Sequence, residues 1–166
     1  MLNRRNALTL LSASALAPTA GFAAPAREIT WEELIPAGVP YGEIIGPGII
    51  DELNDTWAPE FDENAYKMND SLNGAYIKMP GFIIPMELSS AGVTEFLLVP
   101  YVGACIHTPP PPANQLVMVT TENPWPSEDL WEAVWVTGRM NTQLQSTVYG
   151  QTGYAIMADE MEVYVW

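Results

Sequence analysis

Residues 74–166 alternate apolar and polar positions in short runs separated by glycine, proline and small polar residues. A period of two is typical of strands with one buried face, and the runs are rich in β-branched and aromatic residues. The pattern predicts five strands, at residues 75–84, 93–101, 116–121, 133–140 and 160–166. Five short strands with long loops favour a mainly β fold, a small antiparallel OB-like barrel, over a sandwich. Gly81 is expected to mark a bulge in the first strand.

Residues 24–73 lack this alternation and are predicted to be loop-rich, with short helical segments. Thr30 is expected to cap a brief helix, with Glu33 in the capping-box position. Residues 49–53 favour another helical turn, and the polar stretch that follows favours a surface loop or a short helix near residues 63–68. No linker separates this segment from the predicted barrel, so we expect the two to form one compact unit.

The first 23 residues are predicted to be a secretory signal peptide. A basic segment, Met1–Arg5, precedes an apolar stretch at residues 7–20 and small residues that permit cleavage after Ala23 or, alternatively, after Ala26. The apolar stretch is too short to span a bilayer. The two arginines followed by Leu8 resemble a twin-arginine signal but also suit an ordinary signal, so both export routes stay open. The mature protein is therefore expected in the periplasm.

The charge outside this signal is strongly negative. Four permanent cations face twenty carboxylates there, which gives a net charge near −16. Such a chain repels phosphate backbones, so nucleic acid is excluded as a partner, and it attracts cations. No other stretch is apolar for long enough to cross a bilayer, so we expect no transmembrane segment in the mature chain.

The candidate chemistry centres on Cys105 and His107, the single cysteine and single histidine of the chain. They follow a predicted buried strand and precede four prolines, Pro109–Pro112, and an extended backbone would place both side chains on one face. A thiolate and an imidazole suit zinc, with copper as the alternative. Two ligands do not complete a site, so others must come from elsewhere. The candidates are Glu95, Asp159, Glu160 and Glu162, and for Cu(I) Met86, Met118 or Met157.

Two alternatives to a metal site stay open. Cys105 and His107 are also explained as a buried thiol and a hydrogen-bonded imidazole that serve packing. A thiol nucleophile with His107 as its base is disfavoured, because side chains two residues apart on a strand lie ~6–7 Å from one another. No second histidine is present to act as base. We therefore expect a protein that is not an enzyme.

The proline run has two interpretations of its own. A polyproline segment can dock on an aromatic groove of a partner. It also forms a stiff loop, which here would position Asn114 and Gln115. The second interpretation is favoured, because the run is short and adjoins two predicted core strands. Asn114 is then expected to bind loop backbone.

Five segments of the chain resemble a known family: ITWEELIP (29–36), IKMPGFIIPME (77–87), TEFLLVPYVGACIHTPPPPANQ (94–115), VWVTGRM (134–140) and GYAIMADEMEVY (153–164). The family is an exported bacterial domain of unknown function, number 3299. The chain departs from its pattern over residues 38–69 and at Val102, where an aromatic residue is expected after Tyr101.

The resemblance implies a periplasmic protein, since family members look exported and some are encoded beside ABC-type permeases that respond to zinc. No catalytic activity is established for the family as a class, and its motif of Cys-x-His and four prolines corresponds to Cys105, His107 and Pro109–Pro112. We expect a non-enzymatic protein that binds zinc, or assists an ABC-type permease or a periplasmic binding protein. The alternative is a structural or interaction module of the envelope with a buried, metal-free Cys105–His107 pair.

Overall fold

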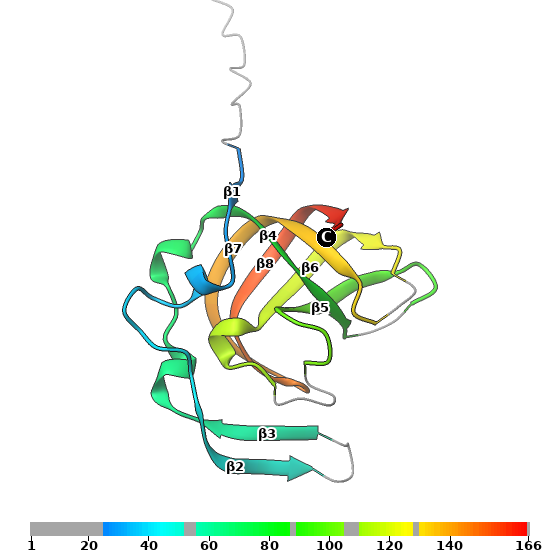
Figure 1. Cartoon of the computed structure of the whole chain (residues 1–166). Helices are drawn as coiled ribbons and strands as arrows, with labels where there is room; N and C mark the ends of the chain where they lie inside the picture. Colours follow the sequence, from blue (N-terminus) through cyan, green and yellow to red (C-terminus); the bar gives the residue numbers. More distant parts are fainter. Residues whose placement is uncertain (1–24, 52–55, 87–88, 105–109, 128–129, 166) are drawn as a thin grey trace, which may run out of the picture.

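The computed structural model describes residues 25–51, 56–86, 89–104, 110–127 and 130–165. Within these ranges no helix has the length and apolar character needed to cross a bilayer. Five strands close into a barrel, and a two-stranded hairpin projects beside one end of it (Figure 1). The fold is therefore mainly β, as the alternation of apolar and polar positions predicts.

The barrel strands follow the order β4-β5-β6-β8-β7, and β7 pairs with β4 to close the ring. Their bounds are β4 (Tyr76–Pro85), β5 (Val93–Val99), β6 (Val117–Trp125), β7 (Ala133–Thr147) and β8 (Gly150–Val163). Strand β4 reaches both neighbours because its first half pairs with β7 and its second half with β5. In this order β6 lies beside β8, although β7 follows β6 in the sequence. A closed barrel of five strands connected in this way is an OB-like barrel.

The barrel is mixed, whereas the sequence favoured an antiparallel one, because β6 and β8 are parallel. The other four pairs of the ring are antiparallel. A closed ring with an odd number of strands cannot alternate direction all the way round, so one pair must run parallel. The parallel pair is the one that joins the β7–β8 hairpin to β6. A short sixth strand, β1 (Arg27–Glu28), also pairs in parallel with β4.

Two details of the predicted strands also differ. Strands β7 and β8 are far longer than predicted and form one hairpin that continues past the barrel wall. Gly81 marks no bulge, because the register of β4 with β7 runs unbroken through it. A Cβ at Gly81 would lie 2.6 Å from Leu98 Cγ and 3.0 Å from the Trp31 ring. The glycine therefore permits close packing of the barrel against Trp31.

Alternate residues of the strands form two apolar clusters. The larger cluster fills the barrel and includes Met79, Phe96 and Val136, and it is covered at one end by Leu34 and Leu72 from the N-terminal segment. The second lies on the other face of β4, β5 and β6 and comprises Phe82, Ile84, Leu97, Val99, Ala104, Leu116 and Met118. Both faces of this wall are thus buried, which explains why β5 reads as a nearly continuous apolar run.

The N-terminal segment contains a hairpin where loop and helix were predicted. Strand β2 (Ile44–Asp51) pairs with β3 (Thr56–Phe61) as a separate two-stranded sheet. The helical turn expected at residues 49–53 is therefore wrong for residues 49–51, and residues 52–53 lie outside the described residues. The sequence does not predict β2 because it contains Gly46-Pro47-Gly48, and glycine and proline disfavour strands except at bulges. The register of β2 and β3 shifts at this point.

Three short 3₁₀ helices complete this segment, η1 (Glu32–Leu34), η2 (Glu63–Tyr66) and η3 (Asp70–Leu72). The first begins after Trp31 and shows half of the expected capping box, because the Thr30 N–H donates to Glu33 Oε1 at 3.2 Å. A fourth, η4 (Ala113–Gln115), follows the proline run and precedes β6. These turns bring the segment onto the end of the barrel where β6 begins.

Candidate functional site

The predicted metal ligands Cys105 and His107 lie outside the described residues, as does Pro109. Their described neighbours are both buried. Ala104 belongs to the outer apolar cluster, and Pro110 lies against the end of the barrel where β6 begins. The described residues on either side of the Cys-His segment therefore lie at this end of the barrel.

The carboxylates that were predicted to complete the metal site lie at the opposite end of the barrel, away from Ala104 and Pro110. Glu95 is near the start of β5, and it pairs with Thr120, which in turn pairs with Met157 of β8. Asp159 and Glu160 follow Met157 and are exposed, as is Glu162, which forms an ion pair with Lys78. Among the described residues, no group of three His, Cys, Asp or Glu side chains could hold a metal ion.

The predicted Cu(I) ligands are likewise separated. Met118 is buried in the outer cluster and Met86 packs at its edge, whereas Met157 is 60% exposed on β8. The structure thus brings neither the predicted carboxylates nor all three methionine side chains together near Ala104 and Pro110, the described residues nearest to Cys105 and His107 in the chain.

The described part of the proline run is buried, so these prolines cannot dock into an aromatic groove of a partner protein. Pro110–Pro112 lead into η4, where Asn114 and Gln115 are buried as well. Asn114 Nδ2 donates to the carbonyls of Asn64 and Lys67 at 2.9 and 3.0 Å, and Gln115 Nε2 donates to the carbonyl of Trp31 at 3.0 Å. The run is therefore a stiff support for two amides that hold the N-terminal segment.

A second link joins the same segment to the barrel interior. Tyr154 of β8 is fully buried, its hydroxyl donates to the Leu34 carbonyl, and the Asn69 N–H donates to its oxygen at 2.6 Å. Burial raises the pKa of Tyr154 to about 12, although the Asn69 N–H opposes the rise. The tyrosine remains neutral at physiological pH and serves as both donor and acceptor.

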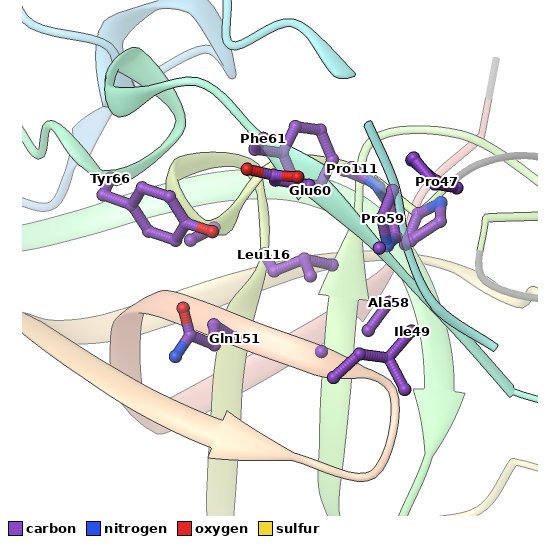
Figure 2. Close-up of a pocket in the computed structure, with 14 residues that line it drawn as sticks. Pro47, Ile49, Ala58, Pro59, Glu60, Phe61, Tyr66, Pro111, Leu116 and Gln151 are labelled. Atoms are coloured by element: carbon purple, nitrogen blue, oxygen red, sulfur yellow. The ribbon is translucent and has the colours of Figure 1, made fainter. Parts of the chain in front are cut away.

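A cleft of about 640 Å³ lies between the β2–β3 hairpin and this end of the barrel (Figure 2). The hairpin side contributes Pro47, Gly48, Ile49, Ala58, Pro59, Glu60 and Phe61. The barrel side contributes Pro110, Pro111, Ala113, Leu116, Gly150 and Gln151, and Tyr66 of η2 completes the described lining. The described lining is mostly apolar, with Glu60 as its single charged side chain.

The hairpin keeps its shape through a bulge and one side-chain hydrogen bond. Trp57 Nε1 donates to the Pro47 carbonyl at 2.6 Å. Gly48 has a φ of 61°, and a Cβ there would lie 1.9 Å from the Ala58 carbonyl oxygen, so this position requires glycine. A Cβ at Gly46 would lie 2.6 Å from Glu60 Oε2, so the Glu60 side chain occupies the space that this glycine leaves free.

The hairpin also presents apolar side chains to solvent. Ile45, Ile49 and Ile50 are 63%, 74% and 66% exposed. Exposed apolar surface of this kind marks interaction sites in soluble proteins. The sequence reasoning missed both the hairpin and the cleft; the available signal was the run IIGPGII, in which two apolar pairs flank a turn-like centre.

Comparison with known proteins gives a family and a fold. The family model described as "Protein of unknown function (DUF3299)" matches residues 31–163. The chain is similar to the crystal structure of a DUF3299 family protein, PA4066, from Pseudomonas aeruginosa PAO1, with 36% sequence identity and a TM-score of 0.69. The match covers 86% of this chain and 99% of that one. A search of the curated proteins finds no match.

Proposed function

The chain belongs to the DUF3299 family, and from that premise we propose that it is a non-enzymatic binding protein of the cell envelope. Its ligand site is the cleft between the β2–β3 hairpin and the barrel. The observation behind this proposal is the cleft itself, a concavity of about 640 Å³ with a mostly apolar lining and a few polar groups. These are the size and composition of small-molecule sites.

The described lining suits binding better than chemistry. Its polar side chains are a carboxylate, a phenol and an amide, from Glu60, Tyr66 and Gln151. The described lining includes no serine, cysteine, histidine or lysine, so the side chains used most often as an activated nucleophile and its base are missing from it. Prolines on both sides of the cleft restrict its backbone, which reduces the entropy lost when a ligand binds.

The envelope location rests on the sequence. Residues 1–23 have the basic, apolar and small-residue parts of a secretory signal, and the rest of the chain is strongly acidic. A role as accessory to an ABC-type permease or a periplasmic binding protein stays a prediction from the family resemblance. Under this proposal, such a partner would bind to the exposed isoleucines of the hairpin, beside the cleft, when the cleft holds its ligand.

Zinc binding by Cys105 and His107 also stays a prediction from the sequence. The described carboxylates that were expected to complete that site lie at the other end of the barrel. A binding role for the cleft does not depend on a metal at Cys105 and His107, so the two proposals are tested separately.

The cleft proposal is tested by nuclear magnetic resonance with an uncharged probe, 4-phenylbutanol, added to the ¹⁵N-labelled mature protein. Saturable shifts are expected at the backbone amides of residues 48–50, 58, 60–61 and 150–151. Ala58→Trp fills the cleft from an exposed position on β3 and should abolish them, whereas Ala91→Trp, in the exposed turn before β5, should not. Shifts spread over the whole surface, or unchanged binding in Ala58→Trp, would contradict a site in the cleft.

A further inference from the structure

We propose that the cleft selects ligands with an apolar body and a single cationic head, of the alkylamine or arylalkylamine class. This inference rests on the proposed function and adds the charge and shape of the ligand. It follows from the distribution of charge in the structure and from the separation of polar and apolar side chains along the cleft.

The charge of the cleft is negative and is not neutralised by the protein's own cations. Glu60 is the charged residue among the described residues that line it. The four permanent cations outside the predicted signal all lie in the described chain and bind elsewhere. Arg27 pairs with Glu33 at 3.3 Å, Lys67 with Glu63 at 2.9 Å and Lys78 with Glu162, and Arg139 Nη1 donates to the Gly74 carbonyl at 2.6 Å.

The surrounding field has the same sign. With four cations against twenty carboxylates outside the predicted signal, the chain repels anions and concentrates cations at its surface. An anionic ligand in the cleft would meet both this field and the Glu60 carboxylate. A cationic ligand gains from both, and the gain is larger in a concave site with apolar sides than on an open surface.

The polar and apolar side chains lie at different ends of the cleft. Figure 2 shows the Tyr66 ring and the Gln151 amide on one side of Leu116, and Ile49 and Ala58 on the other. Glu60 lies beside Phe61, above Leu116 in this view. An ammonium group donates three hydrogen bonds, and the carboxylate, phenol and amide oxygens of Glu60, Tyr66 and Gln151 are acceptors. Isoleucine, alanine, proline and leucine at the second end suit an alkyl or aryl body.

The expected selectivity is moderate, because Glu60 is exposed and the cleft is open to solvent. Ion pairs at such positions are weaker than buried pairs, whereas hydrogen bonds to a charged group are stronger than neutral ones. Together these effects predict that an amine binds about 3- to 10-fold more tightly than an uncharged analogue at low salt. The preference should shrink as ionic strength rises.

The test compares three probes with the same body, 4-phenylbutylamine, 4-phenylbutanol and 4-phenylbutyrate, titrated into the mature protein by nuclear magnetic resonance. Wild type should prefer them in that order. Glu60→Gln should bind the amine about 3- to 10-fold more weakly and leave the alcohol unchanged. Glu60→Lys should reverse the order of the amine and the carboxylate. Glu95→Gln, at the other end of the barrel, is the matched control for loss of one exposed carboxylate.

The outcomes separate this inference from the proposed function. If the alcohol binds in the cleft and the carboxylate binds as well as the amine, the site stands and the cationic class is wrong. Equal loss of amine affinity in Glu60→Gln and Glu95→Gln would overturn the role of Glu60. The net negative charge of the whole protein, and not a local contact, would then explain the preference for amines. If none of the three probes shifts the cleft amides, the proposed function itself fails. Binding of the alcohol by Glu60→Lys shows that this variant keeps its fold.

Discussion

Replacement of Tyr154 by phenylalanine is expected to destabilise the protein by about 2–4 kcal/mol. The hydroxyl joins the barrel interior to two places in the N-terminal segment, the Leu34 carbonyl and the Asn69 N–H. Phenylalanine keeps the ring and its packing in the core. The substitution therefore isolates the contribution of the two hydrogen bonds.

The magnitude follows from the burial of the groups left behind. Each hydrogen bond contributes about 0.5–1.5 kcal/mol, and a buried polar group without a partner costs about 1–3 kcal/mol. Leu34 is fully buried, so its carbonyl loses its partner without access to bulk water. Asn69 is only partly buried, so its N–H can recruit water. The total of about 2–4 kcal/mol is a large share of the stability of a domain of this size.

The assay is urea unfolding followed by tryptophan fluorescence, with the slope of the free energy against urea checked for equality between variants. The control is Tyr76→Phe, which removes a hydroxyl that bonds to Asp159 at the surface. A change within about 0.5 kcal/mol is expected there. If Tyr154→Phe costs no more than Tyr76→Phe, the hydrogen bonds of Tyr154 do not hold the N-terminal segment to the barrel, and the reasoning is refuted.

Three further predictions follow from the same structure. Burial raises the pKa of Tyr154 to about 12, whereas a tyrosine in the unfolded chain titrates at pH ~10. The contribution of Tyr154 to the free energy of unfolding is therefore complete below pH ~10 and is lost as the pH rises toward ~12. The urea midpoints of wild type and Tyr154→Phe should converge over this pH range. Gly48→Ala is expected to destabilise the hairpin by about 1–3 kcal/mol, because its Cβ would meet the Ala58 carbonyl; hydrogen exchange should quicken at residues 44–61 and not in the barrel strands. If Cys105 and His107 hold zinc, mass spectrometry of protein purified without chelator should find near-stoichiometric metal that the Cys105→Ala, His107→Ala double variant lacks, and equal metal in both would exclude the pair.

The strands that could be predicted are those whose apolar faces pack against the core. The first predicted strand, residues 75–84, corresponds closely to β4 (Tyr76–Pro85), and residues 93–101 contain β5 (Val93–Val99). The distal part of β7 could not be predicted in this way. Its residues 143–146 are exposed, so no apolar alternation indicates a strand there, and pairing with β8 alone maintains it. The parallel β6–β8 pair is a property of ring closure, which no local pattern encodes.

The cleft was missed for a related reason. Its described lining comes from residues between 47 and 66, between 110 and 116, and from 150–151, which the fold brings together from three distant parts of the chain. Local chemistry drew attention to Cys105 and His107 instead, because a lone cysteine beside a lone histidine is conspicuous in a sequence. Glu60, a single carboxylate in an acidic chain, has no such signal until its surroundings are known.

The relation between the two sides of the cleft depends on Asn114. The hairpin continues into η2, whose Asn64 carbonyl accepts from Asn114 Nδ2, and Lys67 just beyond η2 accepts from the same group. The other side of the cleft is the proline run that leads directly into Asn114. One buried amide thus links the hairpin side to the barrel side, and the prolines prevent that link from yielding through backbone rotation. The described strands of the hairpin form no ladder with the barrel strands, so side-chain hydrogen bonds such as this one hold the two sides of the cleft together. A site held together before the ligand arrives loses less entropy on binding.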